Sequence, residues 1–84
     1  MSKRSATKDE LFLLKLYSLS SKEPLSEEFQ AEYVASLVGV SPKSAKNMVN
    51  TLAQTNFIKK TTSGHIQITP NGIQLAKQLI DEIG

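Results

Sequence analysis

One stretch of the chain carries polar side chains at spacings that suit contact with a nucleic acid. Between Pro42 and Gln54, a helical turn of about 100° per residue aligns the apolar residues Ala45, Met48, Val49, Leu52 and Ala53. The opposite arc carries Lys43, Lys46, Asn47, Asn50, Thr51 and Gln54. Asparagine and glutamine match the donor–acceptor edge of adenine, and lysine can reach guanine or phosphate. This segment has no acidic residue that would repel a phosphate backbone.

These residue types predict two sets of contacts to double-stranded DNA. The side chains expected to touch base edges are Lys43, Asn47, Asn50 and Gln54. The side chains expected to touch the sugar–phosphate backbone are Ser41, Ser44, Lys46, Thr51, Lys59, Lys60 and His65. The alternative is an ordinary amphipathic helix with a solvated polar face, because all these residue types are common on protein surfaces.

The residues just before this segment have the pattern of two helices joined by a tight turn. Gly39 can adopt a positive φ and so end the first helix. Ser41 offers an N-cap oxygen, and Pro42 fits the first position of the next helix, where its missing N–H is not needed. Ala35 is small enough to let the two helices cross closely. These spacings are typical of a helix-turn-helix, whose second helix enters the DNA major groove.

The distribution of charge favours an anionic partner more than the net charge of +2 does. From Tyr33 to Ile80 the chain has no aspartate or glutamate, and this span carries Lys43, Lys46, Lys59, Lys60, Lys77 and His65. The acids are confined to the two flanks, so one surface can be positive while the chain stays soluble. The alternative is coincidence in a chain of only 84 residues.

Catalysis has little support in the sequence. The single histidine, His65, has no carboxylate within the acid-free span, and there is no cysteine for a thiolate metal site. We therefore expect neither an enzyme nor a cofactor, metal or small-molecule ligand. The chain shows no signal peptide and no apolar run of transmembrane length, so we expect a cytoplasmic protein without membrane contact.

Local signals predict a single domain over residues 7–84 that follows a flexible basic arm over residues 1–6. A first helix runs from Thr7 to about Ser20, with Thr7 and Glu10 at capping-box spacing. A second helix is expected after Ser26, with Glu27 and Glu28 in its first turn and Phe29, Tyr33, Val34, Leu37 and Val38 on its buried side.

The C-terminal third reads as a hairpin followed by a helix. Asn56 tolerates the left-handed conformation that would end the preceding helix. Residues 57–61 and 65–69 alternate polar and apolar side chains around a Ser63-Gly64 tip. Thr69 and Pro70 then cap and open the last helix.

The first helix is apolar on nearly all sides, so it must be covered on more than one side. One cover could be another subunit, because three helices alone would leave apolar surface exposed. We expect a two-fold homodimer, the commonest symmetry of small oligomers. The interface residues expected on the first and last helices are Leu13, Leu16, Ile73, Leu79, Ile80 and Ile83. The alternative is that these residues fill only the core of a single chain.

Three segments together resemble a winged helix-turn-helix domain of the MarR and PadR type of small prokaryotic transcription regulators. They are residues 40–45 at the turn, residues 52–60 leading into the wing, and Ile68-Thr69-Pro70-Asn71-Gly72 after it. The resemblance covers about residues 8–83. It implies a mainly α fold with a small β-hairpin, in the order helix-helix-helix-hairpin wing-helix.

The same resemblance implies a homodimer that binds specific DNA sequences and regulates transcription. It also implies a prokaryotic protein that is associated with the nucleoid. Two departures matter: Asn56 replaces the usual glycine, and the short wing has Lys59, Lys60 and His65 in place of an arginine tip. The second departure argues against deep insertion of the wing into the minor groove. The alternative is a winged helix that serves as a protein-interaction module without direct DNA binding.

Overall fold

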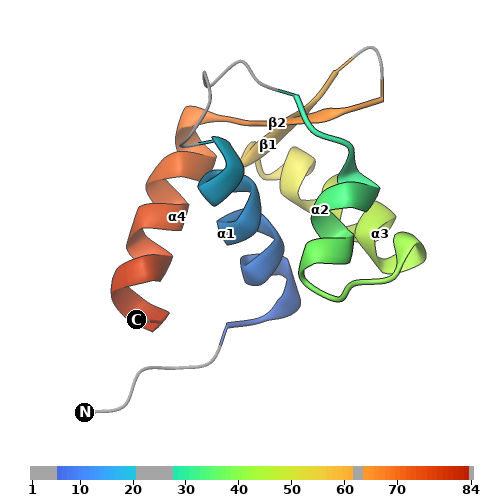
Figure 1. Cartoon of the computed structure of the whole chain (residues 1–84). Helices are drawn as coiled ribbons and strands as arrows, with labels where there is room; N and C mark the ends of the chain where they lie inside the picture. Colours follow the sequence, from blue (N-terminus) through green and yellow to red (C-terminus); the bar gives the residue numbers. More distant parts are fainter. Residues whose placement is uncertain (1–5, 21–27, 62–63, 84) are drawn as a thin grey trace.

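The computed structural model describes residues 6–20, 28–61 and 64–83. In these ranges the chain forms four helices and a two-stranded antiparallel sheet (Figure 1). The elements are α1 (Lys8–Ser20), α2 (Ala31–Leu37), α3 (Pro42–Gln54), β1 (Ile58–Lys60), β2 (Ile66–Ile68) and α4 (Pro70–Ile83). The predicted class, mainly α with a small β-hairpin, is confirmed.

Several predictions from the sequence concern residues that lie outside the described part of the structure. These are the arm over residues 1–6 apart from Ala6, the expected helix start at Ser26 and Glu27, the tip residue Ser63, and the side chain of Ile83. In the described ranges, no helix combines the length and the apolar character that a membrane crossing requires.

The predicted helix caps are confirmed at the starts of α1 and α4. Thr7 and Glu10 form a reciprocal box, in which the Thr7 N–H donates to Glu10 Oε1 at 2.9 Å and the Glu10 N–H donates to Thr7 Oγ1 at 3.2 Å. At α4, the Gly72 N–H donates to Thr69 Oγ1 at 3.0 Å. Each cap satisfies backbone donors that a first helical turn leaves without a partner inside the helix.

The predicted turns on either side of α3 are also confirmed. Gly39 has a φ of +73° and Asn56 a φ of +65°, the left-handed conformation expected of both. Ser41 is extended, and its Oγ accepts a hydrogen bond from the Ser44 N–H at 3.3 Å, while Pro42 opens the helix. The segment between α2 and α3 is therefore a tight turn with a capped second helix.

The hairpin has a simple register that separates its two faces. Ile58 pairs with Ile68, Lys59 with Gln67 and Lys60 with Ile66. The three isoleucines are buried, whereas the two lysines are exposed. The isoleucines therefore close the core from one face, Lys60 lies exposed at the end of that face, and Lys59 lies on the opposite face.

The start of the second helix differs from the prediction. Phe29 forms an isolated antiparallel bridge with Ile66, through N–H···O bonds of 2.9 and 2.8 Å. Its backbone is therefore extended, and α2 begins only at Ala31, after the extended N-cap Gln30. The expected placement of Glu28 in the first helical turn is wrong, because pairing with a strand 37 positions later competes with the local helical signal.

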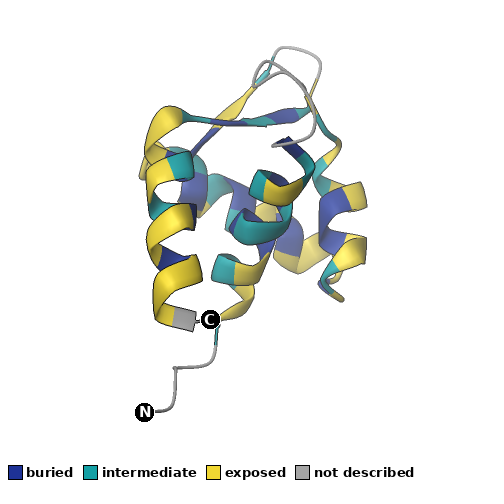
Figure 2. Cartoon of the chain, turned by 60° about the vertical axis from the view of Figure 1, so that its left-hand side comes forward, coloured by how far each residue is buried: buried dark blue, intermediate teal, exposed yellow. Residues whose placement is uncertain are grey.

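The core lies around α1, between α4 on one side and α2 with α3 on the other (Figure 1). Strand β2 covers α1 as well. Figure 2 marks the buried positions of the helices and strands in dark blue. The largest fully buried side chains include Phe12, Leu13, Leu16, Ile58 and Ile66. The hairpin thus supplies the additional cover that α1 needs.

This arrangement corrects the expected dimer interface. Leu13, Leu16 and Leu79 are at most 2 % exposed within one chain, so none of them is available to a partner. Ile73 is half-buried, and among the expected interface residues that the structure describes, only Ile80, 47 % exposed, presents a large apolar surface. The estimate of uncovered surface on the first helix was too large because it left out the sheet as a cover, although Leu11 of α1 remains 39 % exposed.

The expected buried side of α2 is also partly wrong. Val34 and Ala35 are buried, but Tyr33 is 51 % exposed and Leu37 is 45 % exposed. A helix of seven residues presents only about two turns to the core, so its outer apolar residues remain in solvent.

Candidate nucleic-acid interface

Helix α3 is anchored by its apolar stripe and presents its polar arc outward. Ala45, Val49 and Leu52 are buried, and Met48 and Ala53 are half-buried. All but one of the predicted contact residues on or before the helix are exposed: Ser41, Lys43, Ser44, Lys46, Asn47, Thr51 and Gln54. The exception is Asn50, which is half-buried. The face expected from the periodicity is therefore accessible along the whole helix.

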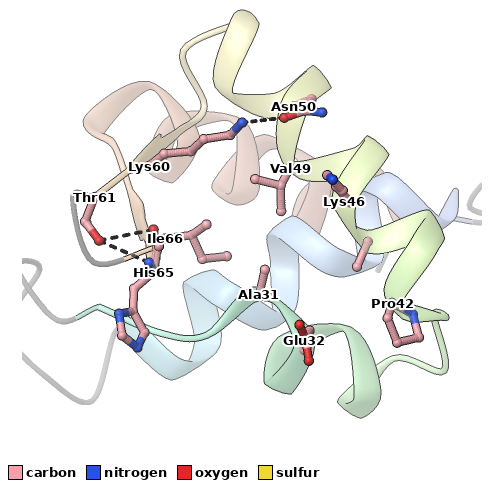
Figure 3. Close-up of a pocket in the computed structure, with 12 residues that line it drawn as sticks. Ala31, Glu32, Pro42, Lys46, Val49, Asn50, Lys60, Thr61, His65 and Ile66 are labelled. Carbon is pink, nitrogen blue, oxygen red and sulfur yellow. Dashed lines mark hydrogen bonds between the residues drawn. The ribbon is translucent and has the colours of Figure 1, made fainter.

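A groove of about 330 Å³ separates this helix from the hairpin (Figure 3). Its apolar floor includes Ala31, Ala45, Val49 and Ile66. Its polar rim is formed by Lys46, Asn50, Lys60, Thr61 and His65. The fold thus brings polar residues of α3 and of the hairpin to one groove. Four of these five residues were predicted from the sequence as DNA contacts: Lys46, Asn50, Lys60 and His65.

The hairpin is linked directly to α3 by a pair of predicted contact residues. The Lys60 ammonium donates a hydrogen bond to Asn50 Oδ1, which lies ten positions earlier in the chain (Figure 3). In the same view, the amide nitrogen of Asn50 points away from Lys60. Because an ammonium has donors only, the oxygen is the atom of Asn50 that it must engage.

The fold also places acidic side chains close to the polar arc of α3. Glu32, in the first turn of α2, lines the groove between α3 and the hairpin. Asp9 of α1 lies beside Ser44, Asn47 and Thr51, at a depression on the other side of α3. The span that is free of acids in the sequence is therefore not free of acidic neighbours in space. The electrostatic attraction of an extended anion is therefore stronger at the middle of the polar arc of α3 than at the two sides of the arc, where Glu32 and Asp9 lie.

His65 has a carboxylate partner that the sequence did not indicate. Its Nδ1 lies 4.0 Å from Glu28 Oε1, with the two side chains 33 % and 44 % exposed. The expectation that His65 has no acidic neighbour was based on residues 33–80 alone and is wrong for the folded chain. Within the described ranges, no cluster of three or more histidine or acidic side chains could hold a metal ion.

Comparison with known proteins adds no assignment. No protein-family model matches the chain, and no curated protein matches it. The function is therefore argued from the geometry of α3, the hairpin and the groove between them.

Proposed function

We propose that this chain is a winged helix-turn-helix protein that binds double-stranded DNA at specific sequences and regulates transcription as a homodimer. The observation that carries the proposal is the outward face of α3. It is polar, accessible and free of acids, and it lies beside a hairpin with Lys59 and Lys60 exposed. The capped, proline-started helix after a tight turn agrees with a recognition helix.

The dimensions of the two surfaces agree with this role. An α-helix with its side chains is about 10–12 Å across, and the major groove is about 12 Å wide. With α3 in the major groove, Lys43, Asn47 and Gln54 in the middle of the polar arc would face base edges. The hairpin would then lie along the flanking phosphates, where Lys59 provides positive charge.

Salt dependence tests the proposal directly. Each phosphate neutralised by lysine releases counterions, so log K falls with log salt at a slope of about −0.9 per contact. Lys43, Lys46, Lys59 and Lys60 in both copies of a dimer predict a slope steeper than about −4 on duplex DNA. Fluorescence anisotropy with a labelled duplex over a series of salt concentrations measures this slope.

A pair of charge-matched variants makes the test specific to the interface. Lys46→Gln removes a charge beside the groove, and should make the slope shallower by about 0.9 per chain. Lys77→Gln removes the same charge from the exposed surface of α4, and should leave the slope unchanged. Equal effects of the two variants would show that binding follows net charge and not the surface of α3. Binding that does not respond to salt would contradict the proposal.

A protein-interaction module is the second candidate, and one observation favours it. Tyr33 and Leu37 are one helical turn apart on α2 and about half exposed, which gives this short helix an apolar outer edge. This alternative predicts that the chain does not bind duplex DNA at low salt. It also predicts that Lys43→Gln and Lys46→Gln leave the binding of the partner protein unchanged.

A further inference from the structure

The two sides of the polar arc of α3 differ in charge in the folded chain. On one side, the groove toward the hairpin contains Glu32 together with Lys46, Lys60 and His65 (Figure 3). On the other side, a depression of about 270 Å³ lies between α1 and α3, and Asp9 of α1 lines it. Of the described residues around this depression, none is basic. Glu32 is therefore offset by cationic neighbours, whereas the side of α3 beside Asp9 is negative.

Helical periodicity relates Asp9 to the residues that are expected to touch DNA. At about 100° per residue, the four expected base contacts fall within an arc of about 60° at the middle of the polar face: Lys43, Asn47, Asn50 and Gln54. Ser44 and Thr51 follow at one edge of this face, and both line the depression with Asp9. The sequence predicts contacts to the sugar–phosphate backbone for these two residues. The fold therefore places a carboxylate beside two expected phosphate contacts.

We propose that Asp9 is a specificity-determining residue, which keeps the phosphate backbone away from its side of α3 and so holds the helix at one angle of roll in the major groove. The inference rests on the proposed binding of duplex DNA. A helix about 10–12 Å across nearly fills a groove about 12 Å wide, so residues on both sides of α3 come close to the two phosphate backbones. A carboxylate on one of these sides repels the phosphates that approach it.

The repulsion acts differently on preferred and random DNA sequences. On a preferred sequence, hydrogen bonds to base edges fix the roll of α3, and the backbone stays clear of Asp9. On random DNA these bonds are missing, and binding depends on the attraction between lysines and phosphates. Without Asp9, the helix would be free to adopt other angles of roll, in which Ser44 and Thr51 reach phosphates. The charge of Asp9 thus weakens binding to random DNA more than binding to the preferred sequence.

Three substitutions of similar shape separate this role from a general effect of net charge. Asp9→Asn removes the charge beside α3. Glu32→Gln removes a charge from the other side, where cationic neighbours already offset it. Asp81→Asn removes an exposed charge from α4, which packs on the far side of α1 from α3 (Figure 1). Circular dichroism checks the fold of each variant, because Asp9 also lies in the first turn of α1, where negative charge suits the helix dipole.

The first measurement compares the affinities for two labelled duplexes, one with the sequence selected from a random pool and one of random sequence. At low salt, Asp9→Asn should bind the random duplex roughly 3- to 10-fold more tightly, and the selected duplex less than about 2-fold more tightly. Glu32→Gln should have a smaller effect on the random duplex than Asp9→Asn. Asp81→Asn should leave the ratio of the two affinities unchanged.

The second measurement locates the DNA backbone. The chain has no cysteine, so Thr51→Cys provides a single attachment point beside Asp9 for an iron chelate that cleaves nearby DNA strands. At equal occupancy of the random duplex, cleavage should increase when Asp9→Asn is added to this labelled variant. Unchanged cleavage would show that Asp9 does not keep the backbone away, and would overturn the inference.

The outcomes separate the inference from the proposed function. If the wild type prefers its selected sequence and Asp9→Asn strengthens binding to both duplexes equally, Asp9 is only a general charge and the inference is wrong. If Asp9→Asn selects a different base at one position, Asp9 contacts that base, and the inference is again wrong. If the wild type selects no sequence, the proposed function is wrong and the inference fails with it.

Discussion

Replacement of Gly72 by alanine should destabilise the protein, although helix propensity alone predicts the opposite. Gly72 is the third residue of α4, and alanine is ordinarily better than glycine within a helix by about 0.5–1 kcal/mol. In the folded chain, a Cβ at this position would lie 2.1 Å from the Phe57 carbonyl oxygen and 2.9 Å from Ile68 Cγ1. To restore ordinary contact distances, α4 or the backbone at Phe57 must move by roughly 1 Å.

The size of the effect follows from what this movement would disturb. The Phe57 carbonyl also accepts a hydrogen bond from the Thr69 N–H at 3.3 Å, and the Gly72 N–H donates to Thr69 Oγ1 at 3.0 Å. Overpacking in a close-packed region typically costs 1–3 kcal/mol, and here the obstacle is backbone, which yields less than a side chain. We expect Gly72→Ala to lower the free energy of unfolding by about 2–3 kcal/mol, or the Tm by about 10–20 °C.

Urea unfolding followed by circular dichroism measures this change in free energy. Asn71→Ala is the matched control, since Asn71 is the exposed neighbour in α4 and its replacement should change stability by no more than about 0.5 kcal/mol. A Gly72→Ala variant as stable as the wild type, or more stable, would refute the close approach of α4 to the residue before β1.

Two further changes test the recognition helix and the assembly. Ser41→Ala removes the N-cap bond to the Ser44 N–H, and should lower the free energy of unfolding by about 1 kcal/mol in urea titrations, an effect absent from Lys43→Ala. Ile80→Glu places a charge on the largest exposed apolar side chain of α4, and should convert a dimer into a folded monomer in sedimentation velocity experiments. A wild-type chain that already sediments as a monomer would contradict the proposed homodimer.

Local chemistry was sufficient to predict most of the element boundaries. The capping box of Thr7 and Glu10, the N-cap of Ser41 and the cap of Thr69 each join residues three positions apart. The left-handed conformation of Asn56 likewise depends on the short polar side chain of that residue. Such signals operate within one or two helical turns, so they can be identified in the sequence without knowledge of the fold.

The periodicity of the longer elements was equally informative about α3. The stripe that includes Ala45, Val49 and Leu52 is buried, and the polar arc opposite it is exposed. An amphipathic helix of 13 residues determines which of its faces turns inward, because burial of the polar face would leave its side chains without partners. The candidate contact residues on this helix could therefore be predicted before the fold was known.

Only the tertiary structure decided which segments meet. The bridge between Phe29 and Ile66 set the start of α2, and the packing of α1 against α4, α2 and β2 enclosed Leu13 and Leu16 within one chain. From the sequence alone, the second helix could have started earlier, at Glu27 and Glu28. The apolar residues around the first helix could equally have been covered by a second subunit. The free energy gained by pairing and packing against a strand that is distant in the sequence cannot be read from neighbouring residues. At these positions it outweighs the local helix propensity.

The same distinction applies to the candidate site. The sequence indicated Asn50 and Lys60 as separate contacts, one for a base and one for phosphate, and the fold joined them through a hydrogen bond. It also placed Glu28 beside His65 and Asp9 beside Asn47. The sequence determined which side chains are available for chemistry. The fold determined their neighbours, because electrostatic and hydrogen-bonding partners are chosen by distance in space and not along the chain.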